Sequence, residues 1–555
     1  MKTINKKLSL VICQLSIAML PLSALHAQQD STLNRTVVVE NEYNPDIMDA
    51  SKINVLPKVE EPAVVKQGIE YATALRPVSS WTYENMSPIT REWPMPDAKR
   101  GYLRAGYGNY GNVDVKAGYV WDMTKQDRLQ VKLSFDGWNG TLEDREEEDW
   151  KSRFYATDVR LGYAHHFRKV TLDLGGGFGS QVFNYLPVSV PESIDRQHHT
   201  LGDFHVGLSS RDQSSPIGFS LQTGMQYFGI KHPLDYESDG KENKIHTVGN
   251  IWKNLDGGQR FGIGFSMDNL SYSSGTLMSN YTSLGLNPYY VLENDDWRLR
   301  FGAHVDWQSG DDSGVDVASD VRVEYLFSDS YVLYLHALGG RELNDYRRLN
   351  GFSPYWSLRG KVASTYVPVN ATLGFKASPV NGLWIHLFGG YRVSNDELSA
   401  VWMPVEPIFH YTRFLQADTK TAYGGAEVKY GYKDWFDVSL KGVFYSWDTD
   451  HDSEEWFLSS KPKAEVTFCA EAKIIEGLKV NVGYEYVQRP SFISGGIYDW
   501  SLGNVNNLSL GVSYEFMKDL SLFGHVNNLL NKQYCHDYGY PAEKLNVLAG
   551  LSLKF

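Results

Sequence analysis

Residues 297–307 read WRLRFGAHVDW, and the alternation within this stretch decides the fold class. In an extended strand one face would carry the apolar side chains of Trp297, Leu299, Phe301, Ala303, Val305 and Trp307. The opposite face would carry Arg298, Arg300, His304 and Asp306. Ten residue steps of roughly 3.3 Å, tilted by about 40°, separate the two tryptophans by roughly 25 Å. This is the height of the apolar band of an outer-membrane β-barrel, so we expect Trp297 and Trp307 to lie in its two aromatic girdles.

The same period of two dominates the chain from Gly101 to the C-terminus. Clear examples are residues 129–136, 478–486, 508–516 and 545–555. By pattern these strands run about 10 to 14 residues, whereas strands of soluble sandwiches are usually about five or six residues long. Their length is closer to that of a tilted membrane-spanning strand. The pattern therefore predicts an all-β fold, a transmembrane antiparallel β-barrel over residues 101–555.

Short polar turns alternate with longer connections, as periplasmic turns and extracellular loops do in such barrels. Short turns are expected near residues 124–126, 168–169, 212–215, 256–258, 293–296, 328–330, 379–382, 433–434, 476–477 and 517–519. Longer loops are expected at 139–151, 231–243, 341–361, 448–461 and 489–504, and residues 395–420 are interpreted as one long loop that could include a strand over 409–417. The count gives about 22 strands, within a range of about 18 to 24.

Composition agrees with a large β protein and excludes other classes. The chain of 555 residues contains 35 Tyr, 25 Phe, 15 Trp and 50 Gly. After the first 30 residues no run is long and apolar enough for a helix that spans a membrane, which needs about 20 such residues. The net charge of −13 disfavours a nucleic-acid partner, because phosphate binding calls for a basic face.

The N-terminus predicts export. Three lysines (Lys2, Lys6 and Lys7) precede an apolar run that ends at Ala27, so residues 1–27 are expected to be a signal peptide. Residues 28–100 are rich in proline and show little alternation, and we expect an extended periplasmic segment there. Cys469 and Cys535 are too few for a disulfide framework and are expected to be thiols.

The end of the chain carries a family resemblance. Residues 520–534 read LSLFGHVNNLLNKQY, residues 539–541 read GYP, and residues 545–555 read LNVLAGLSLKF. This segment resembles the close of a TonB-dependent outer-membrane receptor barrel, in which an N-L-[LF]-[ND]-K-x-Y segment follows the penultimate strand. The terminal Phe555 is similar to the signal that the barrel-assembly machinery recognises. The resemblance implies that the chain lies in the outer membrane, in contact with its lipid and lipopolysaccharide.

The chain departs from that family before the barrel, because residues 28–100 are too few for the globular plug that such receptors carry. Ligand gating by a plug is therefore in doubt. One segment resembles the TonB box that pairs with the energising protein: Arg35, Thr36, Val37, Val38, Val39 and Glu40. An exposed β-prone run can add to the edge of a partner's sheet. An ordinary β-prone stretch in a periplasmic tail is the alternative, and it is the commoner explanation of so short a motif.

Other motifs favour structural roles, and no catalytic, cofactor-binding or metal site is expected. Gly175–Gly179 lacks the lysine and the helix of a phosphate loop, so close backbone approach in a strand explains it better. The acidic runs 143–149 and 448–455 are expected to be solvated loops, although divalent cations could bridge them to lipopolysaccharide. The adjacent pairs His165–His166 and His198–His199 would point to opposite faces of strands, which suits a metal poorly.

Two functions remain open for this barrel. The first is passage or uptake of solutes across the outer membrane, and the second is a binding or scaffold barrel inside an envelope complex that transports nothing. An enzyme is not supported by any motif. A lumen of about 22 strands would leak if it were empty. The N-terminal segment, the long loops or a partner protein must therefore close it.

Overall fold

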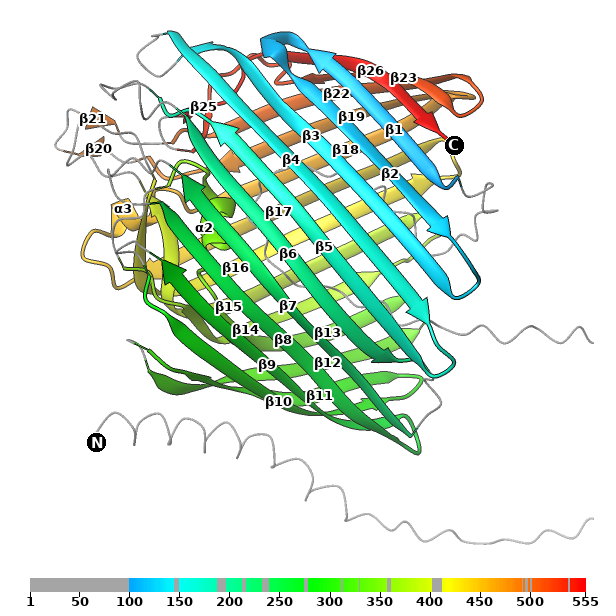
Figure 1. Ribbon diagram of the computed structural model, residues 1–555, viewed down its shortest axis with the longest axis vertical. Coiled ribbons are helices and arrows are strands. Elements are labelled where there is room, and N and C mark those ends of the chain that lie inside the picture. The colour runs from blue at the N-terminus through cyan, green and yellow to red at the C-terminus, as the bar shows by residue number, and fades with distance from the viewer. Residues whose placement is uncertain are drawn as a thin grey trace, which may run out of the picture. The chain divides into compact units, whose positions relative to one another are not determined.

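The computed structural model describes residues 99–143, 149–186, 196–211, 216–231, 239–273, 278–310, 313–328, 330–356, 361–401, 412–491, 493–494, 498–499, 502–537 and 540–555. The predicted signal peptide and the possible TonB box lie outside these residues, as does the predicted periplasmic segment up to residue 98. In the described part of the chain, 22 strands form one sheet (Figure 1).

Each strand of this sheet pairs antiparallel with its neighbours in chain order. The strands are β1 (Gly101–Gly108), β2 (Val113–Asp122), β3 (Asp127–Glu143), β4 (Asp149–His166), β5 (Val170–Phe183), β6 (Gln197–Ser210), β7 (Ile217–Lys231), β8 (Gly240–Leu255), β9 (Gln259–Ser273), β10 (Tyr281–Glu293), β11 (Trp297–Gln308), β12 (Gly314–Ser328), β13 (Tyr331–Glu342), β14 (Thr365–Ala377), β15 (Leu383–Val401), β16 (Arg413–Tyr432), β17 (Phe436–Thr449), β18 (Ala464–Ile475), β19 (Leu478–Gln488), β22 (Val505–Met517), β23 (Leu520–Asn527) and β26 (Asn546–Lys554).

The sheet closes on itself where the last strand meets the first. β26 pairs antiparallel with β1, from Lys554 opposite Tyr102 to Leu548 opposite Gly108. Beyond this ladder the amide of Gly101 donates to the carbonyl of Phe555 at 2.7 Å, and the amide of Phe555 donates to the carbonyl of Gly101 at 2.9 Å. Closure leaves no unpaired sheet edge, which membrane-spanning strands require. The predicted antiparallel barrel and its 22 strands are confirmed.

Nine of the ten predicted short turns fall between consecutive strands at one end of the barrel, and the tenth, residues 212–215, lies outside the described residues. The opposite end, called here the long-loop end, differs from the prediction in the extent of its loops. β3 continues to Glu143 and β4 begins at Asp149, so the loop expected over 139–151 is mostly strand. The loop expected over 231–243 is shorter too, because β8 begins at Gly240.

The single loop expected over 395–420 is also wrong. β15 extends to Val401, and β16 begins at Arg413 and runs to Tyr432, so a strand does occupy the described end of residues 409–417 and continues beyond it. In both regions polar side chains occupy both faces of the strands while backbone pairing continues. Because alternation needs one apolar face, the sequence pattern ends before the strands do.

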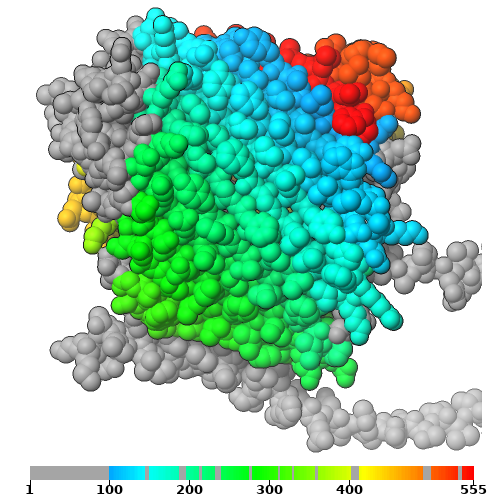
Figure 2. Space-filling view, viewed as in Figure 1, coloured from blue at the N-terminus to red at the C-terminus, as the bar shows by residue number. Residues whose placement is uncertain are grey.

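Outward and inward faces differ as the alternation requires. On β11, Trp297, Phe301 and Trp307 point outward with 39%, 45% and 42% of their surface exposed, whereas Asp306 is 6% exposed on the lumenal face. The outer wall over β1 to β9 is a continuous surface (Figure 2). No helix within the described residues is long and apolar enough to cross a membrane.

The long connections carry short elements of their own. These are the 3-10 helix η1 (Asn109–Gly111), α2 (Tyr346–Phe352), α3 (Glu454–Leu458), the pair β20 (Ile493–Ser494) and β21 (Tyr498–Asp499), and the pair β24 (Cys535–Asp537) and β25 (Tyr540–Pro541). Figure 1 shows α2 and α3 at the end of the barrel where the long connections gather. No disulfide joins Cys469 and Cys535.

Candidate functional site

The connection between β13 and β14, residues 343–364, is called here the crossing loop. Its helix α2 begins after Asp345, whose carboxylate accepts a hydrogen bond from the amide of Arg348 at 2.9 Å. Such a cap satisfies one of the amides that the first helical turn leaves unpaired. Tyr346 and Leu349, three residues apart on one helical face, are fully buried. The loop therefore carries its own buried face, which must pack against other parts of the barrel.

Strand β8 holds the start of α2 through two buried polar contacts. The carboxylate of Glu242, 2% exposed, accepts a hydrogen bond from the amide of Tyr346 at 2.8 Å. The ammonium of Lys244 donates to the carboxylate of Asp345 at 2.5 Å. Charge-assisted contacts of this kind are roughly twice as strong as neutral ones. They fix the position of the helix start against the lumenal face of β8.

Strands β5 and β6 hold the rest of the helix. The guanidinium of Arg347 donates to the carbonyl of Gly202 at 2.6 Å and to the carboxylate of Asp203 at 3.3 Å. Asn350 contacts the imidazole of His199 at 2.8 Å and donates to the side-chain oxygen of Gln181 at 3.1 Å. These contacts come from strands that follow one another in the sheet. One sector of the barrel wall therefore binds α2 over its whole length.

Apolar side chains connect the crossing loop to a second sector of the wall. The buried cluster consists of Phe228, Ile230, Met278, Tyr346, Leu349, Trp356, Val362 and Leu398, with Leu201, Tyr272, Phe352 and Phe414 packed against it. Phe228 and Ile230 belong to β7, whereas Leu398 belongs to β15 and Phe414 to β16. β7 and β15 are not neighbours in the sheet. The crossing loop therefore spans part of the lumen between them.

A second buried cluster joins the crossing loop to two more connections. It consists of Leu142, Trp150, Phe183, Tyr185, Leu186, Tyr355 and Tyr540, with Tyr110 and Phe154 packed against it. The rings of Tyr355 and Tyr540 stack with centroids 3.5 Å apart. Tyr540 belongs to the connection between β23 and β26, and Tyr185 to the one between β5 and β6. Three connections thus meet at the long-loop end.

Glu543 anchors the connection before β26. Its carboxylate accepts hydrogen bonds from the side-chain amides of Asn112, at 2.8 Å, and Asn546. Burial raises the pKa of the Glu543 carboxyl above its ordinary value, while the two amide contacts lower it by less. This group therefore responds to pH at the place where the last connection is held.

A chain of alternating charges continues from α2 to the connection that contains α3. Glu342 accepts from Arg348 at 2.6 Å and from Arg392 at 3.1 Å. Glu397 accepts from Arg392 at 3.2 Å and from Lys461 at 2.8 Å. The hydroxyl of Ser399 also donates to the carbonyl of Phe457 in α3. The β17–β18 connection is thereby fastened to β15, beside the crossing loop.

The lumenal wall between β10 and β13 carries paired charges of both signs. Arg300 contacts Asp320 at 2.7 Å and donates to Asn287 at 2.9 Å. Arg341 contacts Asp316 at 2.9 Å. Of the lumenal charges named from the sequence, Arg300 thus lies in a paired network. A wall of balanced charge gives no strong preference for anions or cations.

The predicted residues that the structure describes lie apart from the crossing loop. Trp297 and Trp307 lie on the outer face of β11, Phe555 lies at the closing seam, and Arg35, Thr36, Val37, Val38, Val39 and Glu40 lie outside the described residues. The described residues contain no group of three or more His, Cys, Asp or Glu arranged to hold a metal. The crossing-loop contacts were missed because they join strands far apart in sequence; only the Asp345 cap was visible as a local signal.

Solved structures share this fold. The FrpB iron transporter from Neisseria meningitidis (F3-3 variant) has 10% sequence identity and a TM-score of 0.65, over 83% of this chain and 82% of that chain. The copper transporter OprC has 13% identity and a TM-score of 0.63, over 82% and 81%. The pyoverdine outer membrane receptor FpvA from Pseudomonas aeruginosa PAO1 has 13% identity and a TM-score of 0.60, over 82% and 78%.

Comparison by sequence gives no such likeness, since no protein-family model and no curated protein matches the chain. Identities this low show a shared fold and nothing finer. The resemblance to the TonB-dependent outer-membrane receptor barrel, drawn from residues 520–555, is therefore confirmed for the fold of the barrel.

Proposed function

We propose that the chain is an outer-membrane uptake barrel whose extracellular mouth is closed by the crossing loop. The observation that carries this proposal is that one loop contacts β5 to β8 on one side and β15 and β16 on the other. A loop fixed across the lumen is a barrier to free diffusion. Solute would pass when this loop moves, since the ordering and release of a segment is a recurrent conformational switch in proteins.

The nature of the contacts supports a loop that can move. Beside the buried apolar cluster that includes Tyr346, Leu349 and Trp356, many of them are hydrogen bonds and ion pairs between side chains, each worth about 0.5–3 kcal/mol. The structural neighbours include proteins named as a copper transporter and an iron transporter. The mixed charge of the lumenal wall favours a polar cargo and does not select its sign.

Energy for opening would come from the periplasm, through the segment Arg35–Glu40. Its valines favour an extended strand that can add to the sheet edge of a TonB-type energising protein. The test replaces Val38 by Pro, which removes an amide donor from that strand. The matched control is Val38→Thr, which keeps the amide and the β-branched side chain. Binding of the energising protein's periplasmic domain should fail with proline and persist with threonine; equal binding by both variants would refute this part.

The proposal as a whole is tested by single-channel conductance in planar bilayers. Four forms are needed: the mature chain, a form lacking residues 28–100, a form in which a Gly-Ser linker replaces residues 345–356, and the form with both changes. If large conductance steps appear only in the forms that carry the linker, with or without the deletion, the crossing loop closes a pore. Large steps after deletion of residues 28–100 alone would assign closure to the N-terminal segment.

The same recordings separate uptake from the second candidate, a scaffold barrel within an envelope complex. That function needs no continuous water path through the lumen. Absence of conductance in all four forms would refute the uptake barrel and favour the scaffold. The aromatic stacking that joins three connections is the feature that a scaffold would also use, as a rigid platform at the cell surface.

A further inference from the structure

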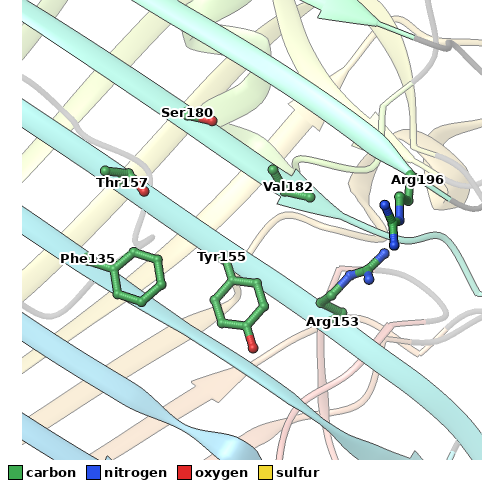
Figure 3. Close-up of a pocket in the computed structure, with 7 residues that line it drawn as sticks. All are labelled: Phe135, Arg153, Tyr155, Thr157, Ser180, Val182 and Arg196. Atoms are coloured by element: carbon green, nitrogen blue, oxygen red, sulfur yellow. The ribbon is translucent and has the colours of Figure 1, made fainter.

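A cavity of about 410 Å³ opens on the outer wall of the barrel, away from the lumen. It is lined by Phe135, Arg153, Tyr155, Thr157, Ser180, Val182 and Arg196 (Figure 3). Tyr155 pairs with Val182 across β4 and β5, and paired residues share one face of a sheet. Leu161 and Phe178 lie on that same face of β4 and β5 and are 54% and 52% exposed. The cavity therefore faces the membrane side of the wall.

Two arginines point toward one another at the end of this cavity that is nearer the long loops (Figure 3). Nε of Arg153 is buried and has no hydrogen-bond partner. Across the described residues, neither Arg153 nor Arg196 forms an ion pair. Two guanidinium groups without a carboxylate between them repel each other, unless an anion lies there. Arginine forks match the oxygens of phosphate with two parallel hydrogen bonds.

The backbone around Arg153 is held in place from within the protein. The side-chain oxygen of Asn184 accepts from the amide of Arg153 at 2.7 Å, and its nitrogen donates to the carbonyl of Lys151 at 2.8 Å. Asn184 itself is buried. The hydroxyl of Ser180 contacts the imidazole of His198 at 2.9 Å on the neighbouring strand. The cavity is thus built on paired strands.

The height of Arg153 matches the level of lipid headgroups. From His165, beside the short-turn end, about 12 residue steps at a tilt of about 40° raise Arg153 by roughly 30 Å. The apolar band of such barrels is about 25 Å tall, so Arg153 lies just above it. Phe135, Tyr155 and Val182 lie below the arginines, where acyl chains would pass.

Other charges near the rim agree with an anionic ligand. Lys151 and Lys231 are exposed, and Lys231 pairs with His198, on the same outward face. The nearest acidic side chains on this face of β3 and β4 are Glu143 and Asp149, closer to the loop tip. Glu143 is already paired with Lys544 at 2.5 Å. Positive charge therefore dominates the described rim beside the cavity.

We propose that this outer-wall cavity binds the phosphate of a phosphorylated glycolipid of the outer leaflet, of the lipopolysaccharide type. Arg153 and Arg196 hold the phosphate, and the acyl chains of the same lipid lie against Phe135 and Val182. The site is independent of the crossing loop, which lies on the lumenal side of the wall.

The test uses the full chain in detergent and native mass spectrometry with purified bis-phosphorylated lipid A. The variant is Arg153→Gln with Arg196→Gln. The charge-matched control is Arg168→Gln with Lys253→Gln, since both residues are exposed near the short-turn end. Heat-dependent electrophoretic mobility shows that each variant has a folded barrel. Two further arms use the same lipid without phosphates and inorganic phosphate as a competitor.

Lipid A should bind the double arginine variant at least about tenfold more weakly, because both charge-assisted contacts to the phosphate are lost. The control should bind as the wild type does, and the dephosphorylated lipid should bind wild type weakly. Unchanged binding by the arginine variant, or an equal loss in the control, would overturn the proposal. Displacement of the lipid by inorganic phosphate at equal concentration would show a site for free anions instead.

Discussion

Tyr355 and Tyr540 stack face to face, with ring centroids 3.5 Å apart and planes inclined by 7°. Tyr355 follows α2 in the crossing loop, and Tyr540 belongs to β25 in the last long connection. Trp150 packs edge-on against Tyr540 at 5.6 Å, and Phe183 packs edge-on against Tyr355 at 5.3 Å. Aromatic contacts to β25 and to the end of β5 therefore hold the part of the crossing loop that follows α2, and Trp150 of β4 packs behind Tyr540.

Replacing Tyr355 by Ala should loosen this end of the crossing loop. An aromatic pair contributes about 0.5–1.5 kcal/mol beyond its buried area, so channel openings should become about two to ten times more frequent. Planar-bilayer recording measures this frequency. Tyr432→Ala is the control, because that ring is 52% exposed near the short-turn end. Equal effects of both substitutions would show that the stack does not hold the loop closed.

Lys244 and Asp345 form a buried ion pair, with side chains 12% and 7% exposed. Lys244→Met leaves the Asp345 carboxylate without its cation, and breaking such a pair costs about 3–5 kcal/mol. Protease cleavage within residues 345–356 should therefore become at least about tenfold faster. The second variant, Lys244→Met with Asp345→Asn, removes the buried charge and keeps a residue that caps helices well. It should recover most of the protection, and no recovery would contradict the ion-pair explanation.

The barrel could be predicted because the residues of each strand reflect, within that strand, which side faces lipid and which faces the lumen. Alternation in residues 297–307 separates a lipid-facing row from a lumenal row, and short turns such as Asp256–Gly258 mark where the chain reverses. The alternation fades where strands rise above the apolar band. Leu398 and Phe414 lie in that region, where residues 395–420 were expected to form one long loop that could include a strand over 409–417.

The site was not predictable for a different reason. Glu242 lies 104 residues from Tyr346, and Gln181 lies 169 residues from Asn350. Such contacts depend on the register and order of strands around the barrel, which one sequence does not determine. The sequence located the crossing loop between residues 341 and 361 but contained no signal for the walls that it contacts.

The raised pKa of Glu543 predicts that the connection between β23 and β26 becomes less stable as pH rises. Its pKa is raised in the folded protein above the ordinary value of 4.5, so the folded state holds a proton that the unfolded loop releases. The contribution of this proton to the stability of the folded connection is fully present below that ordinary value. It is lost as pH rises through the raised pKa. Proteolysis of residues 528–545 should therefore become faster with pH. Glu543→Gln removes the titrating group and should abolish that dependence; a dependence that persists would exclude Glu543 as its source.

Trp297 and Trp307 should lie at the two membrane interfaces. Both indoles are exposed on the outer face of β11, at opposite ends of that strand. In liposomes, lipids brominated near the headgroup should quench them more than lipids brominated at mid-chain. The difference between wild type and each Trp→Phe variant isolates one indole. Trp356, 4% exposed within the crossing-loop cluster, is the control and should be quenched by neither lipid. Stronger quenching of Trp297 and Trp307 at mid-chain depth would contradict the girdle.

Phe555 should determine how efficiently the barrel assembles. Its ring stacks on Tyr119 with centroids 5.8 Å apart, and its backbone completes the seam with Gly101. A Cβ on Gly101 would lie 2.5 Å from the Phe555 ring, so the seam is closely packed. Phe555→Ala should lower the assembled fraction in outer-membrane preparations several-fold, measured by heat-dependent electrophoretic mobility, while Phe555→Tyr should preserve it. Phe516→Ala removes an outward aromatic from β22 that is 40% exposed, and it controls for loss of apolar surface. If Phe555 is a terminal assembly signal, only its substitution should lower the assembled fraction, because the machinery recognises the end of the last strand. Equal losses of the assembled fraction in Phe555→Ala and Phe516→Ala would assign the effect to lipid-facing area alone.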